Sequence, residues 1–334
     1  MLKKAMIMAA GVGSRLEPLS SVTPKPLVPL ANIPTMDILV KHLASYGIKD
    51  VIANTYHKAE TIQEHYRKDD LGTNFEFIKE TQLSGTAGGV KKCQFFFDKG
   101  QDFIIMSGDG LTNLNIKEAY EAHKKSGSIA TIVTKDVEHK EVSKYGIIVP
   151  DKDGYVESFQ EKPSLEEAKS NLANTGIYIF NYEIFNFIPE NTFYDFAKNV
   201  FPSILEAGIK INTYTHYGYW SDIGSIEQYK QSNIDIINGK VPSLKVETKT
   251  FSNGKSTIGK NTIIDNSSEL IGYNAVGNNC SIGKNCVIRN SILWNNVTVK
   301  DNSEIENSII LPNMIIESTI INEIISDSRS EVTV

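Results

Sequence analysis

The chain has 334 residues, 40% of them hydrophobic and 22% charged, which is ordinary for a folded globular protein with room for two domains. Its formal net charge of −6 argues against nucleic acid and anionic membranes as partners, because both require a basic surface. The sequence has neither an apolar run of the ~18 residues that cross a bilayer nor a secretory leader, so a cytoplasmic protein is expected. Its three cysteines form no C-x-x-C pair, so neither a zinc site nor a disulfide framework is expected.

The first predicted element is a buried strand at residues 5–10, and it is followed by the sequence GVGSRLEPLSSVTPKPLVP at residues 11–29. Glycines that follow a strand let backbone N–H groups approach a phosphate closely. Arg15 comes directly after them, and Lys25 lies between two prolines that stiffen its backbone. The spacing fits neither a dinucleotide fingerprint, because Leu16 stands where the third glycine would be, nor a kinase-type phosphate loop. The segment therefore predicts a polyphosphate site with two oriented cations.

Short apolar runs alternate with helical patterns up to about residue 109, which indicates a parallel sheet covered by helices. We expect strands at residues 5–10, 50–54, 75–79 and 102–106, and helices at residues 35–46, 57–68 and 87–97. Gly47 is expected to end the first helix. The ligand crevice should lie at the carboxyl ends of the strands, where residues 11–15 and Asp109 fall.

Strand patterns lie closer together in the middle of the chain and predict a mixed or antiparallel region, followed by a helix at residues 225–238. The strands are expected at residues 129–134, 146–149, 156–160 and 174–180.

A six-residue repeat begins after residue 240. Its aliphatic positions are Ile258, Ile264, Leu270, Val276, Ile282 and Ile288, and after a slip of one residue Leu293, Val299, Ile305 and Leu311. Short polar segments fill the intervals, which is typical of a left-handed parallel β-helix whose aliphatic side chains point inward. We therefore expect two domains, at residues 1–240 and 241–334.

The segment at residues 11–29 resembles the signature of nucleoside-diphosphate-sugar pyrophosphorylases, G-x-G-[ST]-R-L-x-P-L-[ST]-x-x-x-P-K-P-L-[VL]-P. The resemblance implies a Rossmann-like α/β domain with a mixed, mostly parallel sheet, and several branches of the family carry a β-helix after it. It also implies a reaction in which a sugar-1-phosphate attacks the α-phosphorus of a nucleoside triphosphate and releases pyrophosphate. In that reaction Arg15 would meet the departing pyrophosphate, and Lys25 would reach the reacting phosphates.

The two substrates carry roughly six negative charges between them, and Mg²⁺ and basic side chains must offset their repulsion. Asp109 follows an apolar strand in Ser107-Gly108-Asp109-Gly110, where local sequence alone indicates a turn and the resemblance implies a magnesium ligand. Asp222 lies in a segment similar to the family's W-x-D-[IV]-G-[ST] element, although it is placed equally well to cap the next helix. Together Asp109 and Asp222 are expected to hold Mg²⁺.

The remaining family motifs concern the sugar phosphate. Glu161 and Lys162 precede a proline, as in the family's F-x-E-K-P element, so Lys162 would neutralise the attacking phosphate and Glu161 would accept ring hydroxyls. Asn174 and Gly176 match N-x-G-[IV]-[YF], where the asparagine contacts sugar hydroxyls. Gly146 is the glycine expected under the ring.

The nucleotide base should be read near Glu80, at a position where uridylyl- and thymidylyltransferases usually have glutamine. An ionised carboxylate complements the two adjacent donors of guanine, although Gln82 is an alternative reader. The other expected nucleotide contacts are Ala10, Gly11, Gly13, Ser14, Arg15, Lys25, Gly85, Thr86, Gly108 and Asp109. We therefore expect GTP and mannose-1-phosphate as substrates, with a glucose-1-phosphate uridylyl- or thymidylyltransferase as the alternative.

Two other functions compete with this one. Hexapeptide β-helices also serve acyltransferases, but those enzymes generally need a histidine on the repeat and the last histidine here is His216. A regulatory subunit that binds nucleotide sugar without turnover is the second, and the joint presence of the cations and aspartates argues against it. The β-helix is expected to be structural and to favour a homo-oligomer.

Overall fold

The computed structural model describes residues 1–68, 71–251, 253–327 and 332–333. The chain forms two compact units, and each of them is discontinuous in sequence. The sheet unit consists of residues 1–12 and 39–222, and the β-helix unit of residues 13–38 and 223–334. This grouping differs from the linear boundary expected at residue 240, which stays a prediction about sequence domains.

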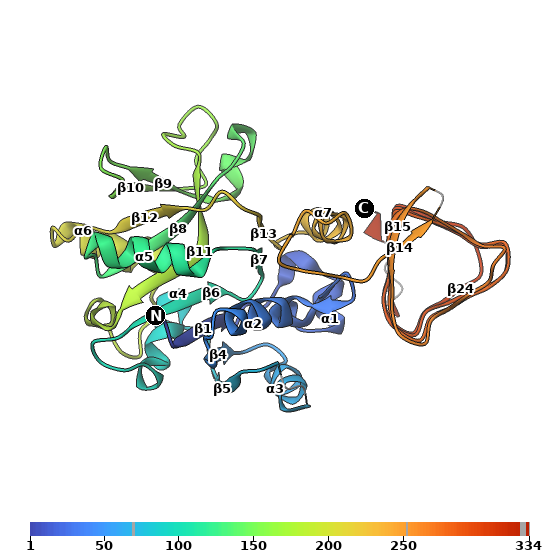
Figure 1. Ribbon diagram of the computed structural model, residues 1–334, viewed down its shortest axis with the longest axis horizontal. Helices are drawn as coiled ribbons and strands as arrows, with labels where there is room; N and C mark the ends of the chain where they lie inside the picture. Colours follow the sequence, from blue (N-terminus) through green and yellow to red (C-terminus); the bar gives the residue numbers. More distant parts are fainter. Residues whose placement is uncertain (69–70, 252, 328–331, 334) are drawn as a thin grey trace. The chain divides into compact units, whose positions relative to one another are not determined.

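The sheet unit is built on a mixed sheet in the strand order β10-β9-β11-β6-β1-β4-β5, with β8 beside β11 and β12 beside β8 (Figure 1). The parallel strands β1 (Lys4–Ala9), β4 (Asp50–Thr55), β5 (Asn74–Lys79) and β6 (Asp102–Ser107) confirm the expected parallel half. The expected mixed region is also confirmed, because β11 runs antiparallel to β6. It comprises β8 (Ala130–Asp136), β9 (Gly146–Pro150), β10 (Val156–Glu161), β11 (Leu172–Asn181) and β12 (Asn212–Thr215).

Four helices follow the expected positions with shifted ends: α2 (Thr35–Ser45), α3 (Ala59–Lys68), α4 (Gly85–Lys92) and α7 (Ile226–Ile237). Helices α5 (Ile116–Ser126) and α6 (Phe201–Glu206) were not expected. The helix expected at residues 87–97 starts earlier and is broken, since a short 3₁₀ turn at Gln94–Phe96 follows α4. The sequence patterns did not predict α5, which begins where the Asn115 side chain accepts a hydrogen bond from Glu118 N and ends at Gly127 with φ 66°. None of the helices in the described ranges is long and apolar enough to span a bilayer.

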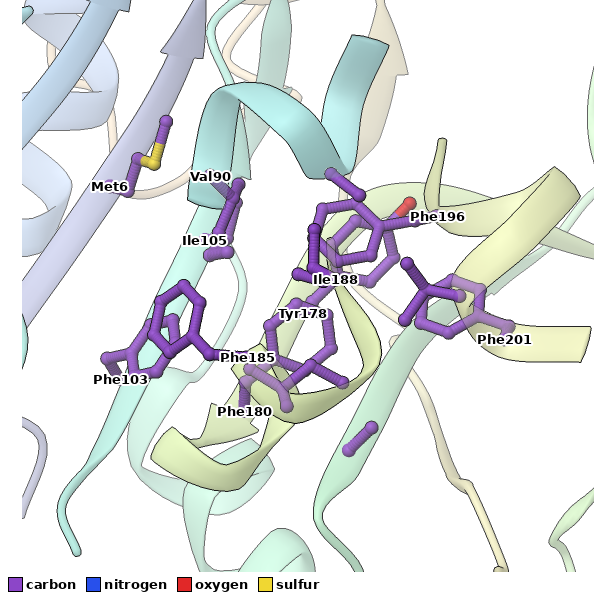
Figure 2. Packing of buried hydrophobic residues seen from close by; sticks show 14 of the residues in the cluster. Met6, Val90, Phe103, Ile105, Tyr178, Phe180, Phe185, Ile188, Phe196 and Phe201 are labelled. Carbon is purple, nitrogen blue, oxygen red and sulfur yellow. The ribbon is translucent and has the colours of Figure 1, made fainter. Parts of the chain in front are cut away.

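An aromatic core holds the middle of the sheet. Figure 2 shows Phe103 of β6, Tyr178 and Phe180 of β11, and Phe185 close to one another. Phe103 and Phe185 stack with ring centroids 5.5 Å apart, and Tyr178 and Phe180 at 5.4 Å. Buried aromatic side chains dominate core energetics. Their packing holds β6 against β11, and the carboxyl end of β6 lies beside the middle of β11, with Met106 opposite Ile177.

The β-helix unit contains three walls of short parallel strands that stack coil upon coil, and Figure 1 shows their triangular outline. One wall is β15 (Gly254–Ile258), β17 (Glu269–Val276), β20 (Ile292–Leu293), β23 (Ile309–Ile310) and β26 (Glu323–Ile325). The second is β16 (Ile263–Ile264), β18 (Ser281–Ile282), β21 (Thr298–Val299) and β24 (Ile315–Ile316), and the third combines part of β17 with β19 (Val287–Arg289), β22 (Glu304–Glu306) and β25 (Ile320–Ile321). Antiparallel strands β14 (Lys249–Phe251) and β27 (Val332–Thr333) flank the two ends.

The inward positions confirm the six-residue repeat over most of its length. Leu270, Val276, Ile282, Ile288, Leu293, Val299 and Ile305 all belong to one buried cluster, with Ile258 and Ile264 packed against it. The expectation for Leu311 is wrong, because that cluster contains Ile310 and Ile316 in its place. The coils shorten along the chain, since stacked asparagines are 18 residues apart at Asn261 and Asn279 but 15 apart at Asn307 and Asn322.

Asparagines make the corners of the coils. Asn279, Asn296 and Asn313 all have positive φ angles, a conformation that asparagine tolerates better than most residues. Their side chains form a ladder, with Asn279 Nδ2 donating to Asn296 Oδ1 at 3.2 Å and Asn296 Nδ2 to Asn313 Oδ1 at 3.0 Å. The polar intervals of the repeat are therefore turns, as expected.

Candidate active site

Two predicted metal ligands are brought together by a strand pair that the sequence did not indicate. Strand β7 (Gly110–Thr112) starts one residue after Asp109, and it pairs antiparallel with β13 (Trp220–Asp222) so that Asp222 lies opposite Gly110. The Asp109 carboxylate accepts a hydrogen bond from Ser107 Oγ at 2.5 Å. The alternative role of Asp222 as a helix cap is wrong, because Ser225 caps α7 and accepts a hydrogen bond from Gln228 N.

The carboxyl ends of β1 and β6 form one edge of the sheet, as expected. Gly108 N donates to Met8 O at 2.9 Å, and a Cβ atom on Gly108 would lie only 2.8 Å from that oxygen. Position 108 therefore needs glycine. This contact brings Gly108 and Asp109 to the edge where Ala10 and Gly11 follow β1.

A cavity of about 380 Å³ opens beside β9, β10 and β11 and gathers three of the predicted sugar-phosphate residues. Gly146, Glu161 and Asn174 all line it. Lys198, which sequence reasoning missed, adds a cation to the lining. The preceding Asp195 accepts hydrogen bonds from Ala197 N and Lys198 N and so starts the short helical turn that carries this lysine. Its capping pattern was the available signal, an aspartate at the start of a short apolar run.

Tyr145 contacts both the motif that contains Lys162 and the motif that contains Asp222. Lys162 N donates to Tyr145 O at 3.1 Å, and Lys162 has a positive φ of 46°. The Tyr145 ring lies 5.3 Å from that of Trp220 in β13. Burial, and then the carboxylates of Glu141 and Asp222, raise the pKa of Tyr145 to about 12. Tyr145 therefore stays a hydrogen-bond donor at neutral pH, beside both motifs.

Trp220 carries an unsatisfied donor. Its Nε1 is buried and has no hydrogen-bond partner among the described residues. A buried polar group without a partner is costly and rare in native proteins. The indole N–H is therefore available to an external acceptor.

Gly176 and Asn174 shape the start of β11. Gly176 has φ 70°, and a Cβ atom there would lie 3.0 Å from Ser107 Cβ, so the backbone passes close to the end of β6. Asn174 Oδ1 accepts a hydrogen bond from Gly176 N at 3.1 Å. The structure thus links these two predicted residues directly.

Glu80 lies inside the protein rather than at an open surface. It is 3% exposed; Asn54 Nδ2 donates to its Oε1 at 2.7 Å, while Lys92 Nζ, at 2.8 Å, and Ser84 Oγ donate to its Oε2. Three of the roughly four acceptor sites of this carboxylate are therefore occupied. A nucleotide base would reach Glu80 only after a rearrangement of these partners, whereas Gln82 is exposed.

The first backbone donors of α4 are bound by the protein itself. The helix begins at Gly85, two residues before its expected start, and Ala87 N and Gly88 N both donate to Tyr194 O at 3.0 Å. A Cβ atom on Gly85 would lie 2.4 Å from the same oxygen. These two donors are satisfied by the protein and do not face a nucleotide. Thr86 Oγ1 donates to Asp195 Oδ2 at 2.9 Å, and the roles of Gly85 and Thr86 in nucleotide binding stay predictions.

Residues 13–29 of the signature segment belong to the β-helix unit, where Gly13 and Lys25 approach each other. Gly13 has φ 77°, and a Cβ atom at this position would lie 3.0 Å from Lys25 Cβ. Ser20 Oγ donates to Gly13 O at 2.9 Å. Lys25 is half-buried, whereas Arg15 is exposed on the short 3₁₀ turn Ser14–Leu16. Gly13 is required both by its conformation and by the approach of Lys25.

Comparison with known proteins identifies the family. Residues 4–239 match the model of the nucleotidyl transferase family, and residues 264–333 match the family described as GlmU-like, C-terminal hexapeptide. Because the first match covers more than half of the chain, the protein belongs to the nucleotidyl transferase family.

Individual relatives differ in the substrates that their names specify. UTP--glucose-1-phosphate uridylyltransferase of Synechocystis is 33% identical, over 87% of this chain and 82% of its own. Mannose-1-phosphate guanyltransferase of Saccharomyces cerevisiae is 31% identical, over 78% of this chain and 71% of its own. The crystal structure of HddC from Yersinia pseudotuberculosis complexed with GMP-PN has a TM-score of 0.61 and 26% identity, and the match covers 70% of this chain and all of that one.

Proposed function

We propose that the protein transfers a nucleoside monophosphate from a nucleoside triphosphate to a sugar-1-phosphate. The observation that carries this proposal is the β7–β13 pair, which places Asp222 opposite the residue after Asp109. The names of relatives such as those from Synechocystis and yeast support a sugar-1-phosphate as the acceptor.

The two aspartates fit a magnesium site. Carboxylate oxygens are the ligands that Mg²⁺ prefers, and the ion usually keeps water and substrate phosphate oxygens in its shell. Asp109 and Asp222 would be the protein ligands of this ion, since the β7–β13 pair places Asp222 opposite the residue that follows Asp109. The chemistry that Mg²⁺ supplies there when bound is neutralisation of charge on phosphate oxygens.

The basic residues orient and neutralise the phosphates. In the proposed reaction an oxygen of the sugar phosphate forms a bond to the α-phosphorus, the bond from that phosphorus to the β-phosphate bridge breaks, and pyrophosphate leaves. Arg15 would bind the departing pyrophosphate, Lys25 the triphosphate, and Lys162 the attacking phosphate. Positioning and charge stabilisation are sufficient for such a transfer, and no covalent enzyme intermediate is needed.

The sugar phosphate would occupy the cavity beside β9, β10 and β11. Glu161 and Asn174 supply acceptors and donors for ring hydroxyls there, and Gly146 leaves room for the ring. Lys198 lines the same cavity and adds a positive charge for the phosphate. The indole N–H of Trp220 would donate to a substrate oxygen and so satisfy the buried nitrogen.

For the specific substrates we propose GTP and mannose-1-phosphate. The yeast relative is named for this sugar and base, and the Yersinia relative is complexed with GMP-PN. Glu80 would accept the guanine donors once the protein partners that now occupy most of its acceptor sites rearrange.

A second candidate pair is UTP with glucose-1-phosphate. The burial of Glu80 favours it, because the exposed Gln82 amide would then read the base, and an amide both donates and accepts. The Synechocystis relative is named for this pair.

Pyrophosphate release from ATP, GTP, UTP and dTTP, each with a panel of hexose-1-phosphates and Mg²⁺, tests these assignments. The proposal predicts the highest kcat/KM with GTP and mannose-1-phosphate. A highest value with UTP and glucose-1-phosphate would establish the second pair. No turnover with any combination would favour the non-catalytic regulatory subunit and contradict the enzyme proposal.

A further inference from the structure

A tight turn follows the signature segment. Strands β2 (Pro29–Leu30) and β3 (Ile33–Pro34) pair antiparallel, and the two residues between them have positive φ angles, 46° at Ala31 and 69° at Asn32. Positive φ at both central residues is the pattern of a type I′ turn, which favours glycine and asparagine. Alanine is sterically disfavoured there, so contacts from outside the turn must hold it.

Those contacts come from α7 and from the β-helix. Asn233 of α7 is 1% exposed, and its Oδ1 accepts a hydrogen bond from Ala31 N at 2.7 Å. Asn32 Nδ2 donates to the carbonyl of Val276 in β17 at 2.8 Å. Each residue of the turn is therefore tied to a different element of the β-helix unit.

The α7 contact is itself anchored on the repeat. Asn233 Nδ2 donates to Tyr229 O at 2.9 Å, and the Tyr229 hydroxyl accepts a hydrogen bond from Trp294 Nε1 at 3.0 Å. Tyr229 is fully buried. Buried and fully paired polar networks of this kind specify one arrangement, because a member that loses its partner is costly.

The turn also connects back to Lys25. Thr35, which follows β3, donates to Val28 O through its backbone N at 3.1 Å and its Oγ1 at 2.7 Å. Val28 N donates to Lys25 O at 3.2 Å, and Lys25 lies against Gly13. These hydrogen bonds, together with the short stretch of backbone from Ala31 to Thr35, join the repeat to the segment that carries the lysine.

We propose that Asn233 and Asn32 are positioning residues, through which the hexapeptide β-helix holds the signature segment in the conformation that binds the triphosphate. This inference rests on the proposed nucleotidyl transfer and deepens it. In this role the repeat domain acts on one substrate only. Neither asparagine is among the residues proposed to bind substrate.

The test compares Asn233→Ala with a matched variant of the same helix, Lys230→Ala. Lys230 Nζ donates to Asn307 O at 2.7 Å, so its loss removes a contact between α7 and the repeat but leaves Ala31 untouched. Asn233→Ala should raise the KM for the nucleoside triphosphate about tenfold, the effect of losing one buried hydrogen bond, and leave the KM for the sugar phosphate unchanged. Lys230→Ala should change neither constant.

Two further variants sharpen the test. Asn233→Asp keeps the acceptor for Ala31 N but loses the donor to Tyr229 O, so it should raise this KM less than Asn233→Ala does. Ala31→Gly in the Asn233→Ala background should also restore it, because glycine adopts positive φ without strain. If Asn233→Ala does not fold, Asn32→Asp removes the donor to Val276 O and Thr257 Oγ1 and should show the same selective rise in KM.

Hydrogen–deuterium exchange of peptides covering residues 13–28 gives a readout that does not depend on turnover. Exchange there should rise in Asn233→Ala and not in Lys230→Ala. If Asn233→Ala has the same KM values as the wild-type protein for both substrates, and its exchange is also unchanged, the inference is overturned. A wild-type protein that releases no pyrophosphate would instead refute the proposed function, and the exchange measurement would still decide the positioning role.

Discussion

Gly110 and Asp222 lie directly opposite each other in the antiparallel pair β7–β13, although they are far apart in the chain. This pairing places Asp222 beside the turn that carries Asp109. The two strands thereby join the end of the central strand β6 to the segment that precedes α7.

Replacement of Asp222 by asparagine should weaken the dependence on Mg²⁺. The amide keeps the shape of the side chain but loses its charge, so we expect the Mg²⁺ concentration for half-maximal activity to rise by about tenfold or more. Titration of pyrophosphate release with MgCl₂ measures this. Asp136→Asn, an exposed aspartate at the end of β8, is the matched control and should leave the titration unchanged. An unaltered titration in Asp222→Asn would remove Asp222 from the metal site.

Replacement of Trp220 by phenylalanine should separate stability from substrate binding. Loss of the unpaired indole N–H should stabilise the free protein by about 1 kcal/mol, because a buried donor without a partner is removed. The same change should raise the KM for the sugar phosphate about three- to tenfold. Trp294→Phe is the control: its Nε1 donates to Tyr229, so that variant should lose stability and keep its KM for the sugar phosphate. A lower unfolding midpoint in Trp220→Phe would contradict the assignment.

Glu80→Gln tests how the base is read. If the carboxylate accepts the guanine donors, the preference for GTP over UTP should fall by about 1–3 kcal/mol. Loss of the ion pair with Lys92 should lower the unfolding midpoint as well. A lower midpoint with an unchanged GTP-to-UTP ratio of kcat/KM would assign Glu80 to the fold and favour Gln82 as the reader.

Asn296→Ala should destabilise the β-helix. It places a Cβ-bearing residue without a side-chain amide at φ 62°, which costs about 1–2 kcal/mol, and it removes two hydrogen bonds of the asparagine ladder. Asn296→Gly removes the same hydrogen bonds without the backbone strain and should be less destabilising. Thermal unfolding of the two variants measures the difference. If both variants lose the same stability, the positive φ angle at position 296 is not the reason that asparagine is needed there.

Three buried histidines predict a loss of stability in mild acid. Burial lowers the pKa values of His42, His123 and His216 in the folded protein. As the pH falls, the same histidines therefore take up protons in the unfolded chain before they do so in the folded chain. Their contribution to stability is complete above pH ~6.5 and is lost as the pH falls, by up to about 1.4 kcal/mol per pH unit for each proton. Urea unfolding between pH 8 and pH 5 measures this slope. His123→Gln should flatten it by one proton, and an unchanged slope would contradict the assignment for that residue.

The sequence predicted those parts of the fold that depend on local pattern. Buried parallel strands have continuous apolar runs, so β1, β4 and β6 were found, and the six-residue repeat predicted the inward side chains from Leu270 to Ile305. The later shift to Ile310 was missed, because Ile310 and Leu311 are both aliphatic and residue type does not show which of them points inward. The shorter coil is visible only from the stacking of Asn307 on Asn322.

The rest depends on contacts between distant segments. No local pattern connects the residues that make these contacts. They are the pairing of β7 with β13, the hydrogen bonds from the start of α4 to Tyr194 O, and the hydrogen bonds from Asn54 and Lys92 to Glu80. Motifs could therefore indicate candidate substrate-binding residues, but not which of these side chains already form hydrogen bonds within the protein. The place of Lys198 in the cavity and the unpaired indole N–H of Trp220 were found from the structure.

Phosphorus NMR of a mixture of GTP, mannose-1-phosphate and Mg²⁺ tests the central claim most directly. Nucleotidyl transfer predicts that pyrophosphate and a nucleoside-diphosphate sugar appear in equal amounts, only when both substrates are present, and that Asp109→Asn and Asp222→Asn slow their formation strongly. Repetition with UTP and glucose-1-phosphate covers the second pair. Signals that stay unchanged with both pairs, or phosphate released from the triphosphate without a sugar nucleotide, would contradict it.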